Sequence, residues 1–473
     1  MKKHIEVDLV VVGAGIAGLS AALEARKVGA RVVVLEKLKA ARGNTYYAGG
    51  GSLFKISAPP QAVVREAART GKGRVDLALV RTFAQHVNES IDWLKSLGLE
   101  WFEPARSMPV SGREGTCVAE DSLGKTRVKG YGRAICHTLV SAAADNGIEL
   151  FFQTRAEKIL KDAQGRITGI RANQKGNVVE VKANGVVLAT GGFQGNREMV
   201  QRFLAPPVSK AKFSGSPFNT GDGHQMALAL GAQLVHTDQW HASLRNKHRI
   251  NPYPRLQYGS ILVNSKGLRF VDEIRNTKDF IAKEMVKQPA GRGAVIFDAN
   301  LKRNFRSGFE EHLDEHKGKA IPRVRKTERD QIESHLLKDG TLIQAGTLQE
   351  LAERIKVPYP NLEKTITDYN ESLSGFRWKG IKPRSTGDPV KIDTPPFYAE
   401  AVGGRLNCTL GGIKISPEAV VVDREDRPIT GLYAAGEIMG GFYYDNYQVI
   451  TGYLPVCLVF GRIAGAGAAK AVR

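Results

Sequence analysis

The N-terminal part of the chain alternates apolar runs with a helical pattern. Residues 8–13 (DLVVVG) are almost continuously apolar and β-branched up to the glycine, which is typical of a strand buried on both faces. Residues 17–29 (AGLSAALEARKVG) place Ala and Leu at helical spacing and stop at a glycine, so they predict a helix. Residues 30–37 (ARVVVLEK) predict a second buried strand with Glu36 at its end. Strand, helix and strand in this order predict a parallel βαβ unit.

Later stretches continue the alternation of strands and helices. Residues 127–160 have the pattern of a helix followed by a strand, and residues 162–185 alternate strands with Gly turns, as in a small β-meander. Two further strands end in glycines, at residues 185–193 (GVVLATGGF) and 430–437 (TGLYAAGE). Polar helices are expected at 300–319 and 348–357.

Length and charge narrow the class of protein. A chain of 473 residues is too long for one simple core, and two intertwined domains are expected. The apolar share of 42% and charged share of 25% are those of a globular protein. The net charge of +20 favours anionic partners such as a carboxylate substrate or a phosphate-bearing cofactor, although a solvated basic surface explains it equally well. No aromatic-interleaved basic motif is present, so no nucleic-acid partner is predicted.

The cysteines and the hydrophobic runs exclude other classes. Four cysteines lie far apart without a CxxC pair, so they predict neither a zinc site nor an iron–sulfur cluster, and no metal site is predicted. Few cysteines favour a reducing compartment, and we expect a cytoplasmic protein. The N-terminal apolar run is too short for a signal peptide and breaks into glycines, and no transmembrane segment is predicted.

The first glycines carry the strongest motif. In Gly13-x-Gly15-x-x-Gly18, the first glycine makes the tight turn, the second lets the backbone approach a pyrophosphate, and the third lets the helix pack on the strand. The helix N-terminus offers N–H groups and a positive dipole end to phosphate. Glu36 can accept hydrogen bonds from an adenosine ribose. Because only one such fingerprint occurs, one tightly held dinucleotide without a separate nicotinamide domain is expected. The turn Gly436–Glu437 would return to this cofactor from the far end of the chain.

Together these pieces resemble the flavoprotein subunits and soluble members of the succinate dehydrogenase/fumarate reductase family. The motifs that carry the resemblance are the glycine fingerprint, RGNTYYAGGG (42–51), VVLATGGF (186–193), NTGDGHQMALALGA (219–232), GLRFVDE (267–273), CTLGGIKI (408–415), GLYAAGE (431–437) and VFGRIAG (459–465). The resemblance implies an α/β fold: a Rossmann-like FAD-binding domain formed by both chain ends, with an inserted α+β capping domain. The expected limits are 1–236 and 396–473 for the FAD domain and 237–395 for the cap.

Departures from the family pattern bear on cofactor and substrate. Asn44 stands where membrane-bound members carry a flavin-linking His, so the FAD is expected to be noncovalent. Cys408 replaces the His of an HTMGG segment that grips a substrate carboxylate. Lys278 replaces the Arg proton donor of a TRD segment, and Lys is not equivalent to Arg. Tyr447 and Gln448 stand near the position of a clamping Arg. We therefore expect a substrate other than plain succinate or fumarate.

The C-terminal segment resembles two further branches of the family. Residues 436–465 resemble tricarballylate dehydrogenase-like flavoproteins and, at the tyrosine, the 3-ketosteroid dehydrogenases. In the latter this tyrosine helps to polarise a ketone, and Tyr447 occupies that position. The Gly-rich turn that normally follows is replaced by Gln448-Val449-Ile450-Thr451, which changes the pocket wall.

The candidate site residues have simpler alternatives. His241 either lines the pocket or is a packing histidine, Tyr447 is a donor or base or packs in the core, and Lys278 is a proton donor or a solvated side chain. Arg405 could hold a carboxylate, as could Arg245, Arg249 or Arg255 in the cap, and Cys408 is expected to be unreactive. The predicted FAD-binding residues are Gly13, Gly15, Ala17, Gly18, Glu36, Lys37, Asn44, Thr45, Gly50, Gly51, Ala156, Thr190, Gly191, Gly192, Asp222, Gly436, Glu437 and Thr451.

These patterns predict an FAD-dependent dehydrogenase or reductase that acts on a CH–CH bond next to a carboxylate or carbonyl. The expected substrate is a small organic acid larger than succinate, and the alternative is a cyclic or steroid-like ketone. A second hypothesis is a flavin-bearing subunit that passes electrons to an iron–sulfur or quinone-linked partner, and a third is a protein that only binds FAD. The electron acceptor is unknown in each case.

Overall fold

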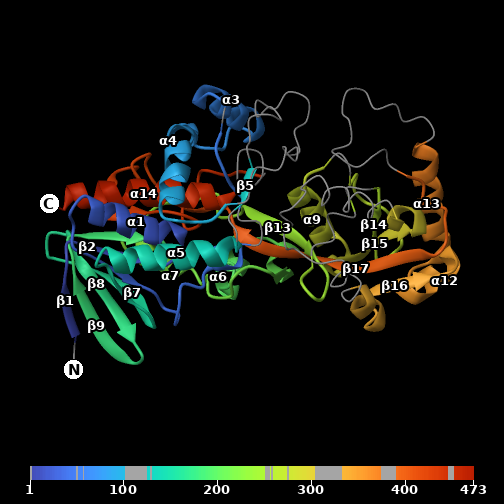
Figure 1. Cartoon of the computed structure of the whole chain (residues 1–473), viewed down its shortest axis with the longest axis horizontal. Coiled ribbons are helices and arrows are strands. Elements are labelled where there is room, and N and C mark those ends of the chain that lie inside the picture. The colour runs from blue at the N-terminus through green and yellow to red at the C-terminus, as the bar shows by residue number, and fades with distance from the viewer. Residues whose placement is uncertain are drawn as a thin grey trace.

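The computed structural model describes residues 3–48, 52–56, 58–101, 125–127, 130–250, 256, 259–273, 276–303, 333–373, 390–445 and 452–472. The predicted site residues Gly50, Gly51, Tyr447 and Thr451, and the cap residue Arg255, lie outside these ranges. Figure 1 shows two bodies along the long axis, with both termini at the end far from the second body.

The first body is built around a six-stranded sheet to which both ends of the chain contribute. Its order is β19-β20-β10-β2-β3-β6, and β10 pairs in parallel with β2 on one side and β20 on the other. The strands β2, β3 and β10 are buried at every residue, as their continuous apolar runs predict. The bounds are β2 Leu9–Val12, β3 Val32–Leu35, β6 Glu149–Phe151, β10 Gly185–Leu188, β19 Val420–Val422 and β20 Pro428–Ala434.

Helices from the two chain ends pack on this sheet through glycines. Helix α1 (Ile16–Lys27) lies against α14 (Tyr453–Ala471), beside each other in Figure 1. A Cβ at Gly461 would come within 2.4 Å of the Ala17 carbonyl oxygen, and one at Gly465 within 2.0 Å of the Ala21 carbonyl oxygen. Helix α14 is the one described helix that is long and apolar enough to cross a membrane, but 61% of its apolar window is buried inside the protein. Its composition is therefore explained by its place in the core.

A second, smaller sheet covers one end of the first body. It has the order β1-β9-β8-β7, and its consecutive strands β7, β8 and β9 are antiparallel, which is the predicted meander. The bounds are β1 Lys3–Glu6, β7 Thr154–Lys161, β8 Ile167–Gln174 and β9 Asn177–Lys182. The remaining elements of this body are α2 Asn44–Tyr47, β4 Ser52–Phe54, α3 Pro60–Thr70, α4 Leu77–Ser96, β5 Lys125–Arg127, α5 Tyr131–Asp145, α6 Arg197–Phe203, η1 Val208–Lys210, α7 Asp222–Leu228, β12 Leu234–Val235 and β18 Gly412–Ile413.

The second body is a sheet centred on one long strand. Strand β17 (Phe397–Thr409) pairs with β15, β13, β16 and β11 and runs back toward the first body. One face packs against α9 and the other against α12 and α13, which gives two separate apolar clusters. The bounds are β11 Lys212–Phe213, β13 Trp240–Arg245, β14 Ile261–Asn264, α9 Lys278–Lys287, η2 Pro289–Gly291, β15 Arg292–Asp298, β16 Leu342–Ala345, α12 Leu348–Ile355 and α13 Tyr359–Ser372. Although β17 follows the expected cap limit at residue 395, it is the central strand of the cap sheet; the exact domain limits stay predictions.

Candidate active site

The turn between β2 and α1 leaves space in front of the helix N-terminus. Gly13 has φ +107°, and a Cβ there would lie 2.4 Å from the Ala189 carbonyl oxygen. A Cβ at Gly18 would lie 1.9 Å from the Gly13 carbonyl oxygen, so the turn and the helix touch. At Gly15, by contrast, a Cβ would meet only Thr45 Oγ1, at 3.4 Å. The predicted roles of the three glycines agree with this geometry: two allow close packing and one faces open space at a positive helix end.

Glu36 and Thr45 line the same space. Glu36 follows β3 and accepts hydrogen bonds from the backbone N–H groups of Ala14 (3.0 Å) and Leu38 (2.9 Å). Burial raises the pKa of the Glu36 carboxyl, and these hydrogen bonds partly oppose the rise. Thr45 Oγ1 accepts from the Ile16 N–H at 3.1 Å. Glu36 and Thr45 thus accept from the Ala14 and Ile16 N–H groups beside the helix N-terminus, where a pyrophosphate would also accept hydrogen bonds.

Lys37 and Asp222, two of the predicted FAD-binding residues, form an ion pair. Lys37 Nζ lies 2.8 Å from Asp222 Oδ2 and 2.7 Å from Thr220 Oγ1, and Arg155 Nη2 lies 2.9 Å from Asp222 Oδ1. Burial by itself would raise the pKa of the Asp222 carboxyl, but the hydrogen bonds from Arg155 and Lys37 outweigh it, so the pKa lies below its ordinary value. Asp222 begins α7, and Ala156 is buried in the neighbouring β7. The network fixes α7 against the sheet.

A buried polar cluster forms around Glu437, on the turn after β20. Asn44 Nδ2 donates to Glu437 Oε2 at 2.6 Å, and Asn219 Nδ2 donates to the same oxygen at 3.2 Å. Burial raises the pKa of the Glu437 carboxyl to about 7, against the hydrogen bonds from Asn44 and Asn219. The adjacent Gly436 has φ +91°, and a Cβ there would lie 2.9 Å from the Cβ of Ala17. The far-end turn therefore lies against the first helix, while its contact with the cofactor stays a prediction.

Several polar atoms of this cluster are buried without a partner among the described residues. They are Glu437 Oε1, Thr190 Oγ1 and both amide atoms of Gln194. Gly191 has φ +74°, and a Cβ at Gly192 would lie 2.3 Å from Thr409 Oγ1 and 2.7 Å from Glu437 Oε1. Buried groups of this kind are costly unless something hydrogen-bonds them. Together with the space at Gly15, they fit a ligand with a polyhydroxyl chain and phosphates, which is what FAD presents.

On the cap side, His241 forms a buried ion-pair network. His241 Nδ1 lies 2.7 Å from Asp279 Oδ1, which also accepts from the Ala242 N–H at 2.7 Å. Lys283 Nζ lies 2.9 Å from Asp279 Oδ2. Burial alone would raise the pKa of the Asp279 carboxyl, but His241 and Lys283 hold it below its ordinary value. Because the ionised carboxylate only accepts hydrogen bonds, we assign a ring proton to Nδ1 of His241.

Two residues of β17 connect this pair to the Glu437 cluster. Cys408 lies opposite His241 in the pairing of β17 with β13, and burial holds the pKa of its thiol well above the ordinary value. Thr409 Oγ1 accepts from the Phe193 N–H at 3.4 Å, and its carbonyl accepts from the Tyr453 hydroxyl at 2.9 Å. The His241–Asp279 pair and the Glu437 cluster thus flank one short stretch of backbone.

Two other predicted catalytic residues, Lys278 and Arg405, also lie on the cap, whereas Tyr447 lies outside the described residues. Lys278 is the exposed first residue of α9, directly before Asp279. Arg405 lies on β17, where its guanidinium is 3.4 Å from the Asn246 carbonyl oxygen. Burial, and repulsion from Arg249 and Arg292, lower the pKa of Arg405. In the pairing of β17 with β13, Arg405 lies opposite Ser243, two residues from His241.

The comparisons with known proteins agree with this geometry. A family model described as "FAD binding domain" matches residues 8–448. The chain belongs to this family. It is 29% identical over 479 residues to a probable fumarate reductase Ifc3 of Shewanella frigidimarina (strain NCIMB 400), covering 98% of this chain and 75% of that protein. It is also 29% identical over 509 residues to a urocanate reductase of Eggerthella lenta, covering 98% of this chain and 75% of the relative.

Solved structures share the fold. An open conformation of a flavocytochrome c3 fumarate reductase superimposes with a TM-score of 0.76 at 27% identity, covering 99% of this chain and 79% of that one. A 3-ketosteroid Δ1-dehydrogenase from Sterolibacterium denitrificans gives a TM-score of 0.79 at 20% identity, covering 98% and 99%, which is a likeness of fold alone. The predicted family, the FAD cofactor and the fold are therefore confirmed, including the likeness to the steroid dehydrogenases.

The individual FAD-binding residues stay predictions. Those that the structure describes lie around the space at Gly15 or in the networks of Asp222 and Glu437. Sequence reasoning missed Asp279, Lys283, Gln194 and Asn219. Asn219 lies within a segment that carried the resemblance, and Asp279 directly follows Lys278 in the segment compared with TRD, so their proximity to the site could have been expected, but their partners could not.

Proposed function

We propose that this FAD-dependent oxidoreductase reduces or forms a carbon–carbon double bond beside the carboxylate or carbonyl group of an organic acid other than fumarate. The observation that carries the proposal is the His241–Asp279 pair, which sits at the end of the cap sheet next to the predicted flavin-binding cluster. Hydride transfer between the flavin ring and a substrate carbon is the chemistry that FAD supplies when bound.

Two side chains would serve the substrate from the cap. His241, oriented by Asp279, would hold the carboxylate or carbonyl oxygen of the substrate and stabilise the charge that develops there. Asp279 acts as a positioning residue, since its oxygens are used by His241, Lys283 and the backbone. Lys278, next to Asp279, is proposed as the proton donor to the carbon beside that group.

The substitution at Cys408 argues against fumarate itself. The histidine of the HTMGG segment, which Cys408 replaces, can be charged and can bind a carboxylate. The buried, neutral thiol of Cys408 cannot. One of the two carboxylate anchors expected for a C4 dicarboxylate is thus absent at this position. The urocanate reductase among the relatives supports the idea that members of this family accept other unsaturated acids.

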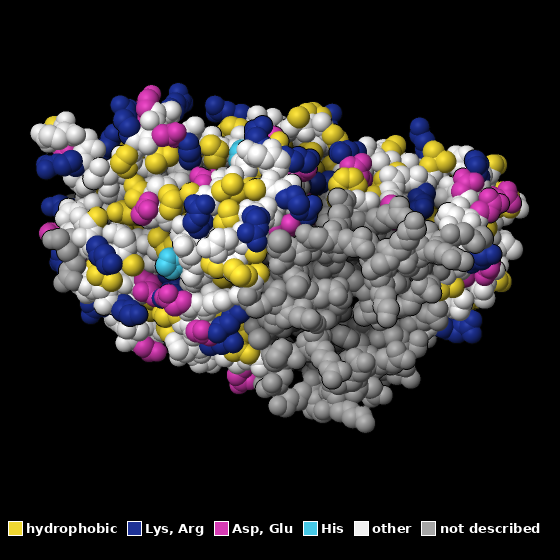
Figure 2. Space-filling view, turned by 90° about the horizontal axis from the view of Figure 1, so that it is seen from above, with side chains coloured by type: hydrophobic (Ala, Val, Ile, Leu, Met, Phe, Trp, Pro, Cys, Tyr) yellow, Lys and Arg dark blue, Asp and Glu magenta, His cyan; other side chains and the backbone are white. Residues whose placement is uncertain are grey.

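The charge of the protein bears on its redox partner and on its anionic substrate. Figure 2 shows Lys and Arg side chains distributed among acidic and apolar ones over the face it displays. Arg245 and Arg292 pair with Gly403 from opposite sides of β17, two residues from Arg405, so the net charge of +20 includes one local basic row that would favour an anionic substrate or acidic redox partner. The electron donor would be a separate redox protein or quinone-linked partner, and a cytoplasmic location stays a prediction.

The test is to reduce the holoprotein chemically, mix it anaerobically with candidate oxidants, and monitor reoxidation through the absorbance of the flavin. The panel contains fumarate, larger 2-enoic acids, aryl-substituted acrylates and cyclic enones. We expect a 2-enoic acid other than fumarate to reoxidise the flavin at least about tenfold faster than fumarate does. Faster reoxidation by a cyclic enone would favour the ketone desaturase, and no reoxidation by any member would contradict an enzymatic role on C=C bonds.

A further inference from the structure

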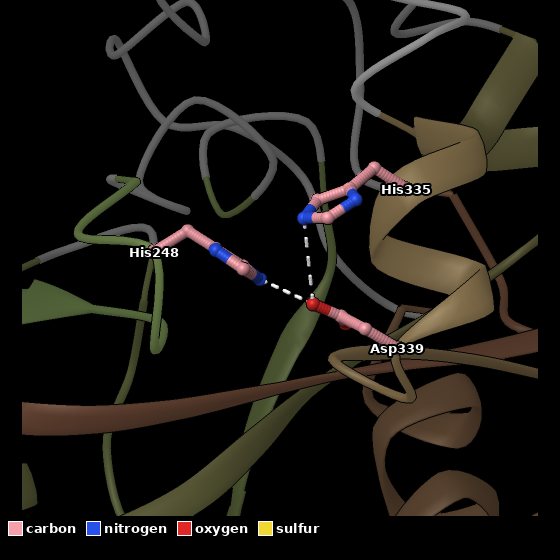
Figure 3. A group of neighbouring side chains, drawn as sticks. All are labelled: His248, His335 and Asp339. Carbon is pink, nitrogen blue, oxygen red and sulfur yellow. Dashed lines mark hydrogen bonds and ion pairs between the residues drawn. The ribbon is translucent and has the colours of Figure 1, made fainter.

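A second group of chemically capable side chains lies on the cap, formed by His248, His335 and Asp339. His248 follows β13, while His335 and Asp339 are four residues apart at the end of the helical segment 333–338. Figure 3 shows both imidazoles directed at the Asp339 carboxylate from different parts of the chain. His335 Nε2 lies 3.7 Å from Asp339 Oδ2, and His248 Nε2 forms a hydrogen bond with the same oxygen. The three ligand atoms lie within 4.8 Å of one another.

Other contacts hold these side chains in place. Asn246, which is 1% exposed, accepts from the His248 and Ile250 N–H groups at 2.9 and 3.0 Å and so closes the turn that carries His248. Its side chain is anchored in turn by the buried Glu400, at 2.9 Å. Asp339 Oδ1 accepts from the Thr341 N–H and hydroxyl, at 2.9 and 2.6 Å. The second carboxylate oxygen is therefore directed at the imidazoles, in the way that outer hydrogen bonds orient metal ligands.

The position between these groups already attracts a cation. Lys247 Nζ lies 3.1 Å from Asp339 Oδ2 and 2.9 Å from the Asp339 carbonyl oxygen. The Lys247 side chain is 53% exposed, so it can swing into solvent when another cation arrives. Hydrogen bonds from Thr341, His248 and Lys247 hold the pKa of the Asp339 carboxyl well below its ordinary value.

We propose that His248, His335 and Asp339 form a binding site for a divalent transition metal, with Zn²⁺ as the best chemical match. Two imidazole nitrogens and one carboxylate oxygen are a ligand set that Zn²⁺ accepts, with a fourth position for water or a further oxygen. The hard cations Mg²⁺ and Ca²⁺ prefer oxygen ligands only. Bound metal would tie the loop after β13 to the segment 333–338, and so would connect the strand that carries His241 to the segment that precedes β16.

The proposed metal site lies on the cap and shares no residue with the predicted flavin site. Its expected effect is greater thermal stability of the cap, because an ion that binds only the folded state stabilises it by mass action. Flavin content and flavin colour are not expected to change. The proposal does not depend on the proposed reaction.

Calorimetric titration of the metal-stripped holoprotein with Zn²⁺ tests the proposal. We expect one Zn²⁺ site of micromolar or better affinity, and a fall of at least about 30-fold in affinity for His335→Ala and for His248→Ala. His335 is 62% exposed, so its removal should leave folding and FAD content intact. Zn²⁺ should raise the Tm of the wild type and not that of His335→Ala.

His86 provides the matched control. It is an exposed histidine beside one carboxylate, with Nδ1 4.0 Å from Glu89, and no second imidazole joins it among the described residues. His86→Ala should bind Zn²⁺ as the wild type does, and Lys247→Gln should bind at least as tightly. Absence of Zn²⁺ binding at 100-fold excess, or unchanged affinity in His335→Ala, would overturn the proposal.

Discussion

The cofactor cradle and the cap-side pair are built in different ways. We define the cradle as the residues around Gly13, Gly15, Gly18, Glu36 and Glu437. The backbone shapes it: Gly13 and Gly18 leave no room for a Cβ, and the remaining walls are a helix end and a turn from the far end of the chain. The cap-side pair, His241 and Asp279, is shaped by side chains that are 38 residues apart and meet because α9 packs on β13.

This difference indicates which parts of such a protein tolerate substitution and which do not. A backbone cradle tolerates few substitutions, because each alters the space available to the cofactor. A side-chain site can change its substrate through single exchanges, such as a thiol at Cys408. We therefore expect substitutions of the closely packed cradle glycines to remove the folded, flavin-loaded protein, and substitutions in the cap to change catalysis while flavin remains bound.

The largest effect is expected for Gly18→Ala. A Cβ would lie 1.9 Å from the Gly13 carbonyl oxygen, so the helix must move away from the turn, at a cost of more than about 4 kcal/mol. Purified protein should lack FAD or be insoluble, as measured by the flavin-to-protein ratio. The matched control is Gly346→Ala, whose Cβ meets its nearest atom at 3.6 Å and should keep full FAD content. A yellow, stable Gly18→Ala protein would break the comparison.

Glu437→Gln should change the pH dependence of stability. The carboxyl pKa is about 7 in the folded protein, above its ordinary value of 4.5, so the folded state binds the proton more tightly. Stability from this group is complete below about pH 4.5 and is lost as the pH rises through about 7, by up to about 3 kcal/mol. In the FAD-free protein, the stability of the Gln variant relative to wild type should therefore rise between pH 5 and 8, as measured by denaturant unfolding.

Asp222→Asn serves as the control for that experiment. The pKa of Asp222 lies below its ordinary value of 3.8, so its contribution is fully present above that value and is lost only at lower pH. Its effect on stability should be the same at pH 5 and pH 8. A Glu437→Gln effect that is equally flat would contradict the buried, protonatable carboxyl.

Asp279→Asn should lower kcat/KM by about 100-fold, a typical contribution of positioned acid–base and charge-stabilising groups. The reason is that His241 loses the ionised partner at 2.7 Å. The flavin-to-protein ratio should stay at the wild-type value. Asp92→Asn, in an exposed pair with Lys55, is the control and should leave both quantities unchanged. Loss of flavin together with activity would mean that the pair supports the cradle instead.

Lys278→Ala should lower kcat by about tenfold, which is less than the roughly 100-fold minimum typical of a proton donor, because water can replace it in part. Its Tm should not fall, since a cation at the first position of α9 opposes the helix dipole. Lys287→Ala, in the last turn of the same helix, should show the reverse: unchanged kcat and a slightly lower Tm. An unchanged kcat for Lys278→Ala would mean that Lys278 is a solvated surface residue and not the proton donor.

The sequence allowed the cradle to be predicted, but not the details of the cap. The glycine spacing and the acid at the end of the second strand are local patterns with one structural meaning, so Gly13, Gly18 and Glu36 lie where we expected them. Asp279 was missed because its partner depends on the packing of a helix on a distant strand. His335 and Asp339 were missed because the absence of a metal site was inferred from the cysteines alone. Their proximity to His248 also depends on the packing of distant segments.

The most direct test of the central claim is the product of a single turnover. The reduced holoprotein would be mixed anaerobically in D₂O with the unsaturated acid that reoxidises it fastest, and the product analysed by mass spectrometry. We predict one saturated acid per flavin oxidised, with deuterium from the solvent at the carbon beside the carboxylate, whether or not exchange of the flavin N5–H also labels the neighbouring carbon. Flavin reoxidation without a saturated product would contradict the account and favour a protein that only transfers electrons.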